Sequence, residues 1–145
     1  MKRRIDLKGL AAILAVSLAL GGCATMQQAP GAKNRVVIQV SDNDPAKWNL
    51  ALNNAKNLQA DLGANNVEIE IVAYGPGLAM LKNGSAVGTR VDEAGVSGAK
   101  ILACENTMRN QKLEKSDMLP GISYVGAGVV EIMQKQQQGW AYLRP

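Results

Sequence analysis

The chain has 145 residues, with 16 lysines and arginines, 12 aspartates and glutamates, two cysteines and no histidine. The lack of histidine excludes a Ser-His-Asp triad, a Cys-His pair and an imidazole-ligated zinc site. Two cysteines are too few for a four-thiolate metal site or a disulfide-rich framework. The length suits one domain, which would bury roughly two-thirds of the surface that the unfolded chain exposes.

Residues 1–22 have the pattern of an export signal. Four basic residues lie within Met1–Lys8, and an apolar segment follows from Leu10 to Leu20. That segment is too short to cross a bilayer, because a membrane-spanning helix needs about 20 apolar residues. A basic start followed by a short apolar run and small residues therefore predicts a signal peptide that is removed after export.

The end of this segment, Leu20-Gly21-Gly22-Cys23, resembles the lipobox of bacterial lipoproteins. The resemblance implies cleavage before Cys23 and a lipid anchor on that residue. Ala24 stands where lipoproteins retained in the inner membrane typically have aspartate, which implies an outer-membrane location facing the periplasm. The alternative is an ordinary export signal with an incidental cysteine.

The export route and the charge balance also follow from this segment. Arg3-Arg4 resembles a twin-arginine motif, but Asp6 stands where that motif prefers an apolar residue, so a general secretory signal is the alternative. Cleavage removes four basic residues and one acidic residue, which brings a chain of net charge +4 close to neutrality. Since no basic cluster remains, we expect no nucleic-acid partner.

A polar tether is predicted over residues 23–34, and a folded domain over residues 35–145. The tether contains a Pro-Gly pair and shows no hydrophobic period, so a typical end-to-end span is roughly 20 Å. Arg35–Val40 is β-branched and bounded by turn residues, which predicts the first strand.

The first helix is expected to begin with Asp44 as its N-cap and Pro45 as its first residue. Gly63 is a plausible stop. Apolar residues recur between them at three- and four-residue steps and predict one apolar helix face, made of Trp48, Ala51, Leu52, Ala55, Leu58 and Leu62.

The middle of the chain predicts two more strands and two helical stretches. A second strand at Val67–Tyr74 has apolar residues on both faces at its end, as in a sheet covered on both sides. The following elements are a tight turn at Gly75–Gly77, a short helix at Leu78–Leu81, a helix at Ala86–Ala94 ended by Gly95, and a third strand at Lys100–Ala103 that stops at Cys104.

The C-terminal part continues the alternation of strands and helices. Its expected elements are a helical turn capped by Asn106 or Thr107, an irregular stretch at 117–120, a strand at Ile122–Val125, a helix from Gly128 to Gly139 with Val129, Val130 and Met133 on one side, and a strand at Trp140–Leu143. Helical crossovers between strands favour a parallel sheet. The sequence thus predicts an α/β fold, a three-layer α/β/α sandwich with a mostly parallel five-stranded sheet.

The candidate site lies where strands end, because ligands of such sheets bind beyond the carboxyl ends of the strands. Cys104 is the only nucleophile with a physical case: it ends a strand just before a helix start, where amide groups favour a thiolate. Arg109 and Lys112 could add positive charge. The alternative is a small buried hydrophobe, since Ile101, Leu102 and Ala103 before it resemble core residues.

Other candidate features have simpler interpretations. Asp42 and Asp44 could hold a hard cation, but a lone acidic pair before a helix is more often a cap, so we expect no metal site. The glycine pairs at 75–77 and 126–128 do not match a phosphate-binding loop. Structural roles are expected for the methionines Met108, Met118 and Met133 as core filler and for Trp48 and Trp140 as packing anchors.

The domain as a whole resembles the DsrE/DsrF-like family. The similar stretches run in order through the domain: Val40–Pro45, Trp48–Asn54, Val72–Gly77, Ala103–Met108 and Gly139–Leu143. The resemblance implies a parallel α/β/α sandwich and a homo-oligomer, a trimer or hexamer. It also implies transport of sulfur as a persulfide on a single cysteine, as in family members that serve sulfur oxidation and tRNA thiolation, and Cys104 stands at the matching position.

A persulfide carrier needs an accessible thiolate, nearby amide donors and a partner protein that delivers or removes sulfur. Asn106 and Thr107 could supply donors, Tyr74 and Asn43 could wall the pocket, and Arg109 could add charge. No cofactor is required. Two alternatives remain open, namely a non-catalytic module that binds a small ligand or a protein, and a redox sensor that forms an intermolecular Cys104 disulfide.

Overall fold

The structure, a computed structural model, describes residues 33–145. The predicted signal peptide, the lipidation site Cys23 and nearly all of the predicted tether lie outside the described residues. Five strands form one sheet in the order β4-β3-β2-β1-β5, and each neighbouring pair is parallel. The strands are β1 (Asn34–Val40), β2 (Val67–Ala73), β3 (Lys100–Cys104), β4 (Ser123–Val125) and β5 (Ala141–Leu143). The predicted parallel α/β fold is confirmed.

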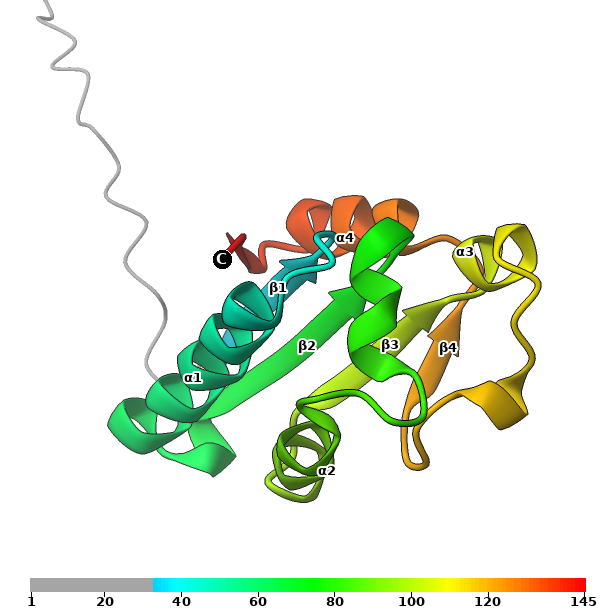
Figure 1. The fold of residues 1–145 in the computed structure, drawn as a ribbon. Coiled ribbons are helices and arrows are strands. Elements are labelled where there is room, and N and C mark those ends of the chain that lie inside the picture. Colours follow the sequence, from blue (N-terminus) through cyan, green and yellow to red (C-terminus); the bar gives the residue numbers. More distant parts are fainter. Residues whose placement is uncertain (1–32) are drawn as a thin grey trace, which may run out of the picture. The chain divides into compact units, whose positions relative to one another are not determined.

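Helices cover both faces of this sheet (Figure 1). The α-helices are α1 (Pro45–Leu62) and α2 (Gly88–Val96) on one face, α4 (Gly128–Gln137) on the other, and the short α3 (Glu105–Asn110) directly after β3. Three 3-10 helices complete the description, η1 (Ala64–Asn66), η2 (Gly75–Leu81) and η3 (Lys115–Asp117). Among the helices of residues 33–145, none combines the length and hydropathy required to cross a membrane.

The first strand and helix form where the local sequence signals place them. β1 begins one residue before the predicted boundary, so Asn34 belongs to the sheet rather than to the tether. The Asp44 side chain accepts a hydrogen bond from the Ala46 amide at 2.9 Å, and Pro45 is the first residue of α1. Gly63 ends the helix with a φ of 86°, a conformation that favours glycine. The predicted cap and stop are both confirmed.

The face covered by α1 and α2 holds the larger apolar core. Strand residues such as Ile38 and Ile71 are fully buried against α1, α2 and η2, and Trp48, Met108 and Met118 belong to the same core as expected. The chain packs so closely here that a Cβ on Gly77 would lie 2.3 Å from the Val40 carbonyl oxygen. Gly77 therefore lets η2 approach the end of β1.

The face covered by α4 has a smaller core. Val129, Val130 and Met133, which are expected on one side of the helix, are 55%, 42% and 50% exposed, so that side faces away from the sheet. The helix instead buries Gly128 and Ile132, which lie one turn apart on its sheet-facing side. Val37, Val72, Leu102, Ile132 and Trp140 form the core, so Trp140 is a packing anchor as expected, and Met133 is not core filler.

Several predicted boundaries move by one or two residues. Helix α2 runs through Gly95 to Val96, since the Ser97 amide still bonds to the Glu93 carbonyl at 3.0 Å. Helix α3 begins at Glu105, so Cys104 itself is the N-cap residue, in place of Asn106 or Thr107. The other shifts are small: β2 ends before Tyr74, β4 starts at Ser123, and β5 starts after Trp140. Of the expected irregular stretch at 117–120, Asp117 belongs to η3 and the rest follows it.

Candidate functional site

Cys104 is the last residue of β3 and the cap of α3. Successive side chains of a strand point to opposite faces, so Cys104 shares a face with Leu102, which belongs to the core under α4. Its Cα pairs with Val125 at the end of β4. The residue is only 4% exposed, so the thiol lies beneath the surface at the carboxyl end of the sheet.

The surroundings of this sulfur are polar. The Gly128 amide, the first of α4, donates a hydrogen bond to Cys104 Sγ at 3.3 Å. Burial raises the pKa of the Cys104 thiol, but hydrogen bonding from the Thr107 hydroxyl and from the amides of Gly128, Thr107 and Asn106 outweighs burial and holds the pKa below its ordinary value. Donors aimed at the sulfur stabilise the thiolate, which is the nucleophilic form of cysteine.

Thr107 connects the thiol to the neighbouring strand. Its side chain is buried, and its Oγ1 accepts a hydrogen bond from the Gly75 amide at 2.9 Å. Because that oxygen accepts from the backbone of the β2–η2 junction, its own proton remains available for the sulfur. This geometry supports the predicted role of Thr107 as a donor to the sulfur. The Asn106 side chain is exposed, and only its backbone amide contributes to lowering the thiol pKa.

Gly128 reaches the sulfur because it has no side chain. A Cβ at this position would lie 3.1 Å from the Tyr74 Cβ and 3.2 Å from the Val72 Cγ1. Tyr74 thus packs under the start of α4 rather than lining an open pocket, and burial is the main cause that raises the pKa of its hydroxyl. The sequence places Gly128 at a turn and the start of a helix but gives it no role at the thiol; the pairing of β3 with β4 is what brings it to Cys104.

An open pocket of about 380 Å³ lies next to the thiol region, between α3 and α4. It contains the predicted residues Asn106 and Arg109, whose side chains are hydrogen-bonded to each other, while Cys104 is not among its lining residues. The predicted pocket residue Asn43 has an exposed side chain in the β1–α1 loop and does not line it. The remaining lining residues are Val125, Gly126, Ala127, Val130, Glu131 and Gln134.

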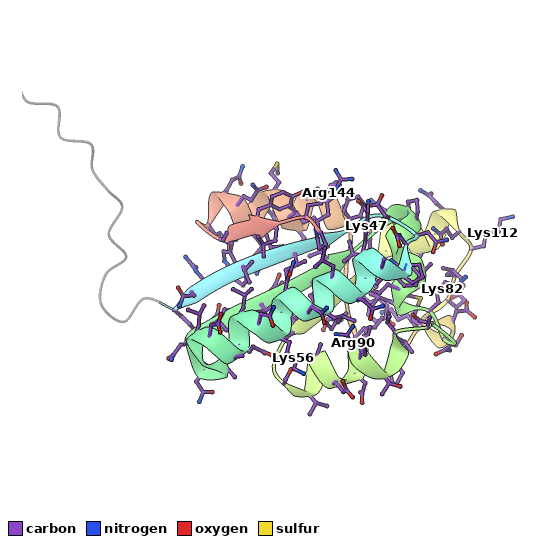
Figure 2. All side chains as sticks on the ribbon, turned by 60° about the vertical axis from the view of Figure 1, so that its left-hand side comes forward. Lys47, Lys56, Lys82, Arg90, Lys112 and Arg144 are labelled. Carbon is purple, nitrogen blue, oxygen red and sulfur yellow. The ribbon has the colours of Figure 1, made fainter. Side chains whose placement is uncertain are left out.

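The acidic pair after β1 serves the fold. Asp44 caps α1, and Asp42 forms ion pairs with Lys47 at 2.8 Å and with Arg144 at 3.8 Å. Figure 2 shows Lys47 and Arg144 at this end of the molecule. The hydrogen bond from Lys47 is the main cause that lowers the pKa of Asp42. Within residues 33–145, no cluster of three or more acidic, cysteine or histidine side chains could hold a metal ion.

Comparison with solved structures finds similar folds in several microbial proteins. A protein of unknown function from Methanobacterium thermoautotrophicum, MTH1491, is 37% identical, with a TM-score of 0.74 over 78% of this chain and all of that one. BT1422, a conserved protein of unknown function from Bacteroides thetaiotaomicron, is 18% identical, with a TM-score of 0.64 over 77% of this chain and 95% of that one. The ychN protein of E. coli is 12% identical, with a TM-score of 0.58 over 78% of this chain and 99% of that one.

The last two similarities concern the fold alone. No curated protein sequence matches the chain. Residues 34–145, the whole of the folded domain from the first residue of β1, match the sequence pattern of the DsrE/DsrF-like family. The chain therefore belongs to the DsrE/DsrF-like family, whose members include sulfur-relay proteins.

Proposed function

We propose that this domain carries sulfur as a persulfide on Cys104. The observation that carries the proposal is the set of hydrogen-bond donors around Sγ, which lowers the pKa of the thiol despite its burial. A lowered pKa raises the fraction of thiolate at neutral pH, and only the thiolate attacks a sulfur atom efficiently. The family membership supports the same role.

The transfer step is a simple exchange between sulfurs. The Cys104 thiolate attacks the outer sulfur of a donor persulfide, a new S–S bond forms on Cys104, and the donor's S–S bond breaks. The donor leaves as a thiolate: its inner sulfur is reduced while the Cys104 sulfur is oxidised by the same amount, and the transferred outer sulfur keeps its oxidation state, so no further oxidant is needed. The product anion remains next to the Gly128 amide and the Thr107 hydroxyl, which are suited to stabilise it.

Burial of the sulfur adds a requirement to this proposal. A donor cannot reach a residue that is 4% exposed, so transfer has to follow a local opening of the structure around Cys104. We expect the rate of sulfur loading to depend on that opening as well as on the thiol pKa.

The test is sulfur loading of the full-length chain, purified in detergent, with glutathione persulfide as donor. Peptide mapping by mass spectrometry should find one added sulfur atom on the Cys104 peptide and should distinguish it from Cys23. Thr107→Val keeps the shape of the side chain but removes the hydroxyl, so loading near neutral pH should become slower. The proposal fails if Cys104 gains no sulfur while a small thiol of similar pKa reacts under the same conditions.

The cellular location is a proposal that rests on the sequence of residues 1–24. We propose that the chain is a lipoprotein attached through Cys23 to the outer membrane and facing the periplasm. Metabolic labelling with a tagged fatty acid, followed by membrane fractionation, should place the label on the wild type and on Cys104→Ser but not on Cys23→Ser. Labelling of Cys23→Ser at the wild-type level would contradict the lipid anchor.

The partners proposed are a sulfur donor or acceptor protein and other copies of the same chain. The exposed side chains of Val129, Val130 and Met133 form an apolar strip on α4, which is the type of surface that subunit interfaces cover. Light scattering should report a trimer or hexamer, and Val130→Glu should shift it toward the monomer. A wild-type monomer at micromolar concentration would contradict self-association.

A second function, a non-catalytic binding module, is favoured by one specific observation: Cys104 is buried, and the pocket between α3 and α4 does not expose it. If binding alone matters, cells with Cys104→Ser should behave as wild type. If instead this variant gives the same phenotype as deletion of the whole gene, a non-catalytic binding module is excluded. Burial also hinders an intermolecular Cys104 disulfide, and non-reducing gels after oxidant treatment test that redox-sensor alternative.

A further inference from the structure

A buried carboxylate lies beneath α4. Glu70 of β2 is 4% exposed, and its Oε1 accepts a hydrogen bond from Lys135 Nζ at 2.9 Å. The Nζ of Lys100 lies 3.4 Å from the same oxygen, whereas the other oxygen, Oε2, has no hydrogen-bond partner in the described part of the chain. The Lys135 side chain is only 15% exposed, so this ion pair is largely withdrawn from water.

Lys135 is held by more than one group. Its Nζ lies 3.6 Å from a Glu131 carboxylate oxygen one helical turn earlier, and 4.3 Å from the centre of the Trp140 ring. An ammonium over the face of an indole ring is attracted by the ring's negative face. The Lys135 side chain therefore joins α4 to β2 through Glu70 and to the segment before β5 through Trp140.

Apolar packing alone attaches α4 weakly. Only Gly128 and Ile132 of the helix are buried, and three of its larger apolar side chains face outward. When a buried ion pair loses one partner, the remaining charge has no compensation, so the buried arrangement becomes much less favourable. Removal of either charge of the Glu70–Lys135 pair should therefore weaken the attachment of α4 to the sheet.

The start of the same helix covers the thiol. Gly128, the first residue of α4, contacts Cys104 Sγ through its amide. The other helix at the sulfur, α3, follows Cys104 directly in the chain and cannot move away from it. Movement of α4 is therefore the displacement that exposes the sulfur with least disturbance of the sheet.

We propose that Glu70 and Lys135 form a clasp that sets how often α4 leaves the sheet, and hence how fast the Cys104 sulfur is reached. Both are positioning residues, since neither touches the sulfur. The inference deepens the proposed persulfide function by naming what regulates access to the site. It concerns the exposure of the thiol and can be tested without any sulfur transfer.

The experiment measures alkylation of Cys104 by iodoacetamide in the full-length chain, with peptide mapping to separate Cys104 from Cys23. Glu70→Gln removes the charge and nearly keeps the shape. Glu68→Gln is the matched control, because Glu68 lies on the same strand and the same sheet face but is exposed and pairs with Lys33 at 3.5 Å. We expect Glu70→Gln to react about tenfold faster or more, and the control within about twofold of wild type.

The denaturant dependence of alkylation separates a clasp from a general loss of stability. Local opening exposes little surface, so the faster alkylation of Glu70→Gln should change little with urea well below the unfolding transition. Lys135→Met should also react faster, and Lys135→Arg, which keeps the charge, should stay close to wild type. These lysine variants keep the test decisive if Glu70→Gln does not fold.

Two outcomes would overturn the clasp. One is equal alkylation rates for wild type and for the folded variants that remove a charge; the other is a rate increase with the full urea dependence of global unfolding. Failure of the persulfide proposal looks different: Cys104 would be alkylated faster in Glu70→Gln, yet would accept no sulfur in either protein.

Discussion

The two faces of the sheet are stabilised in different ways. On the face under α1 and α2, the core is continuous and apolar, with fully buried side chains from three strands and from η2. On the face under α4, a small core adjoins a buried carboxylate, a partly buried lysine and the only cysteine of residues 33–145. The comparison points to a division in which the first face provides most of the stability, while the second holds the sulfur of the proposed function and covers it.

The largest expected effect tests the stabilising face. Ile71 is fully buried there, so Ile71→Ala removes apolar contacts and leaves a cavity. We expect a loss of about 3 to 4 kcal/mol in the free energy of unfolding, measured by urea denaturation. A loss below about 1 kcal/mol would show that this core is less tightly packed than the structure indicates.

The corresponding change on the other face is Ile132→Ala, in the middle of α4. Ile132 packs against a smaller core, and the helix has few other buried side chains. We expect a loss of about 2 kcal/mol in global stability, near the lower end for such truncations, together with faster alkylation of Cys104. A loss as large as that of Ile71→Ala, with unchanged Cys104 reactivity, would contradict the division between the faces.

A smaller effect is expected at the start of α1, on the stabilising face. Asp44→Ala removes the hydrogen bond to the Ala46 amide and should cost about 1 kcal/mol of unfolding free energy. The matched control is Asn43→Ala, since the neighbouring side chain is exposed and makes no cap, and its stability should stay within about 0.5 kcal/mol of wild type. Neither change should alter the alkylation rate of Cys104.

The smallest effect concerns the pH dependence that Cys104 contributes. The folded state lowers the pKa of the thiol from its ordinary value of 9.0. The folded protein therefore releases this proton at lower pH than the unfolded chain, and the resulting stabilisation grows as pH rises toward 9 and disappears as pH falls through the folded pKa. The free energy of unfolding of wild type and of Cys104→Ser should be measured by urea denaturation across this pH window. The difference between the two should shift in favour of wild type as pH rises. A difference that does not change with pH would mean that the thiol pKa is unperturbed.

Much of the fold could be predicted because its signals are local. The cap at Asp44, the stop at Gly63 and the β-branched strands each depend on a few neighbouring residues, and the structure confirms them. The parallel topology follows from the alternation of strands and helices. The placement of Cys104 at a strand end was likewise predictable, because the strand stops there.

The remaining features depend on which surfaces meet in three dimensions. Val129, Val130 and Met133 are apolar and share one side of α4, yet the helix places Gly128 and Ile132 against the sheet and these three outward. Glu68 and Glu70 both alternate with apolar residues along β2, yet Glu70 is covered by α4 and paired with a lysine 65 residues away. No local pattern distinguishes these two glutamates.

The lengths of the outer strands have a consequence for association. Both edges of the sheet, β4 and β5, are only three residues long. A strand from another molecule could therefore add few backbone hydrogen bonds at either side, which disfavours open-ended stacking of sheets into fibres. Side chains on the helices offer a better surface for contact between copies of this domain, because there the sequence can select a defined geometry.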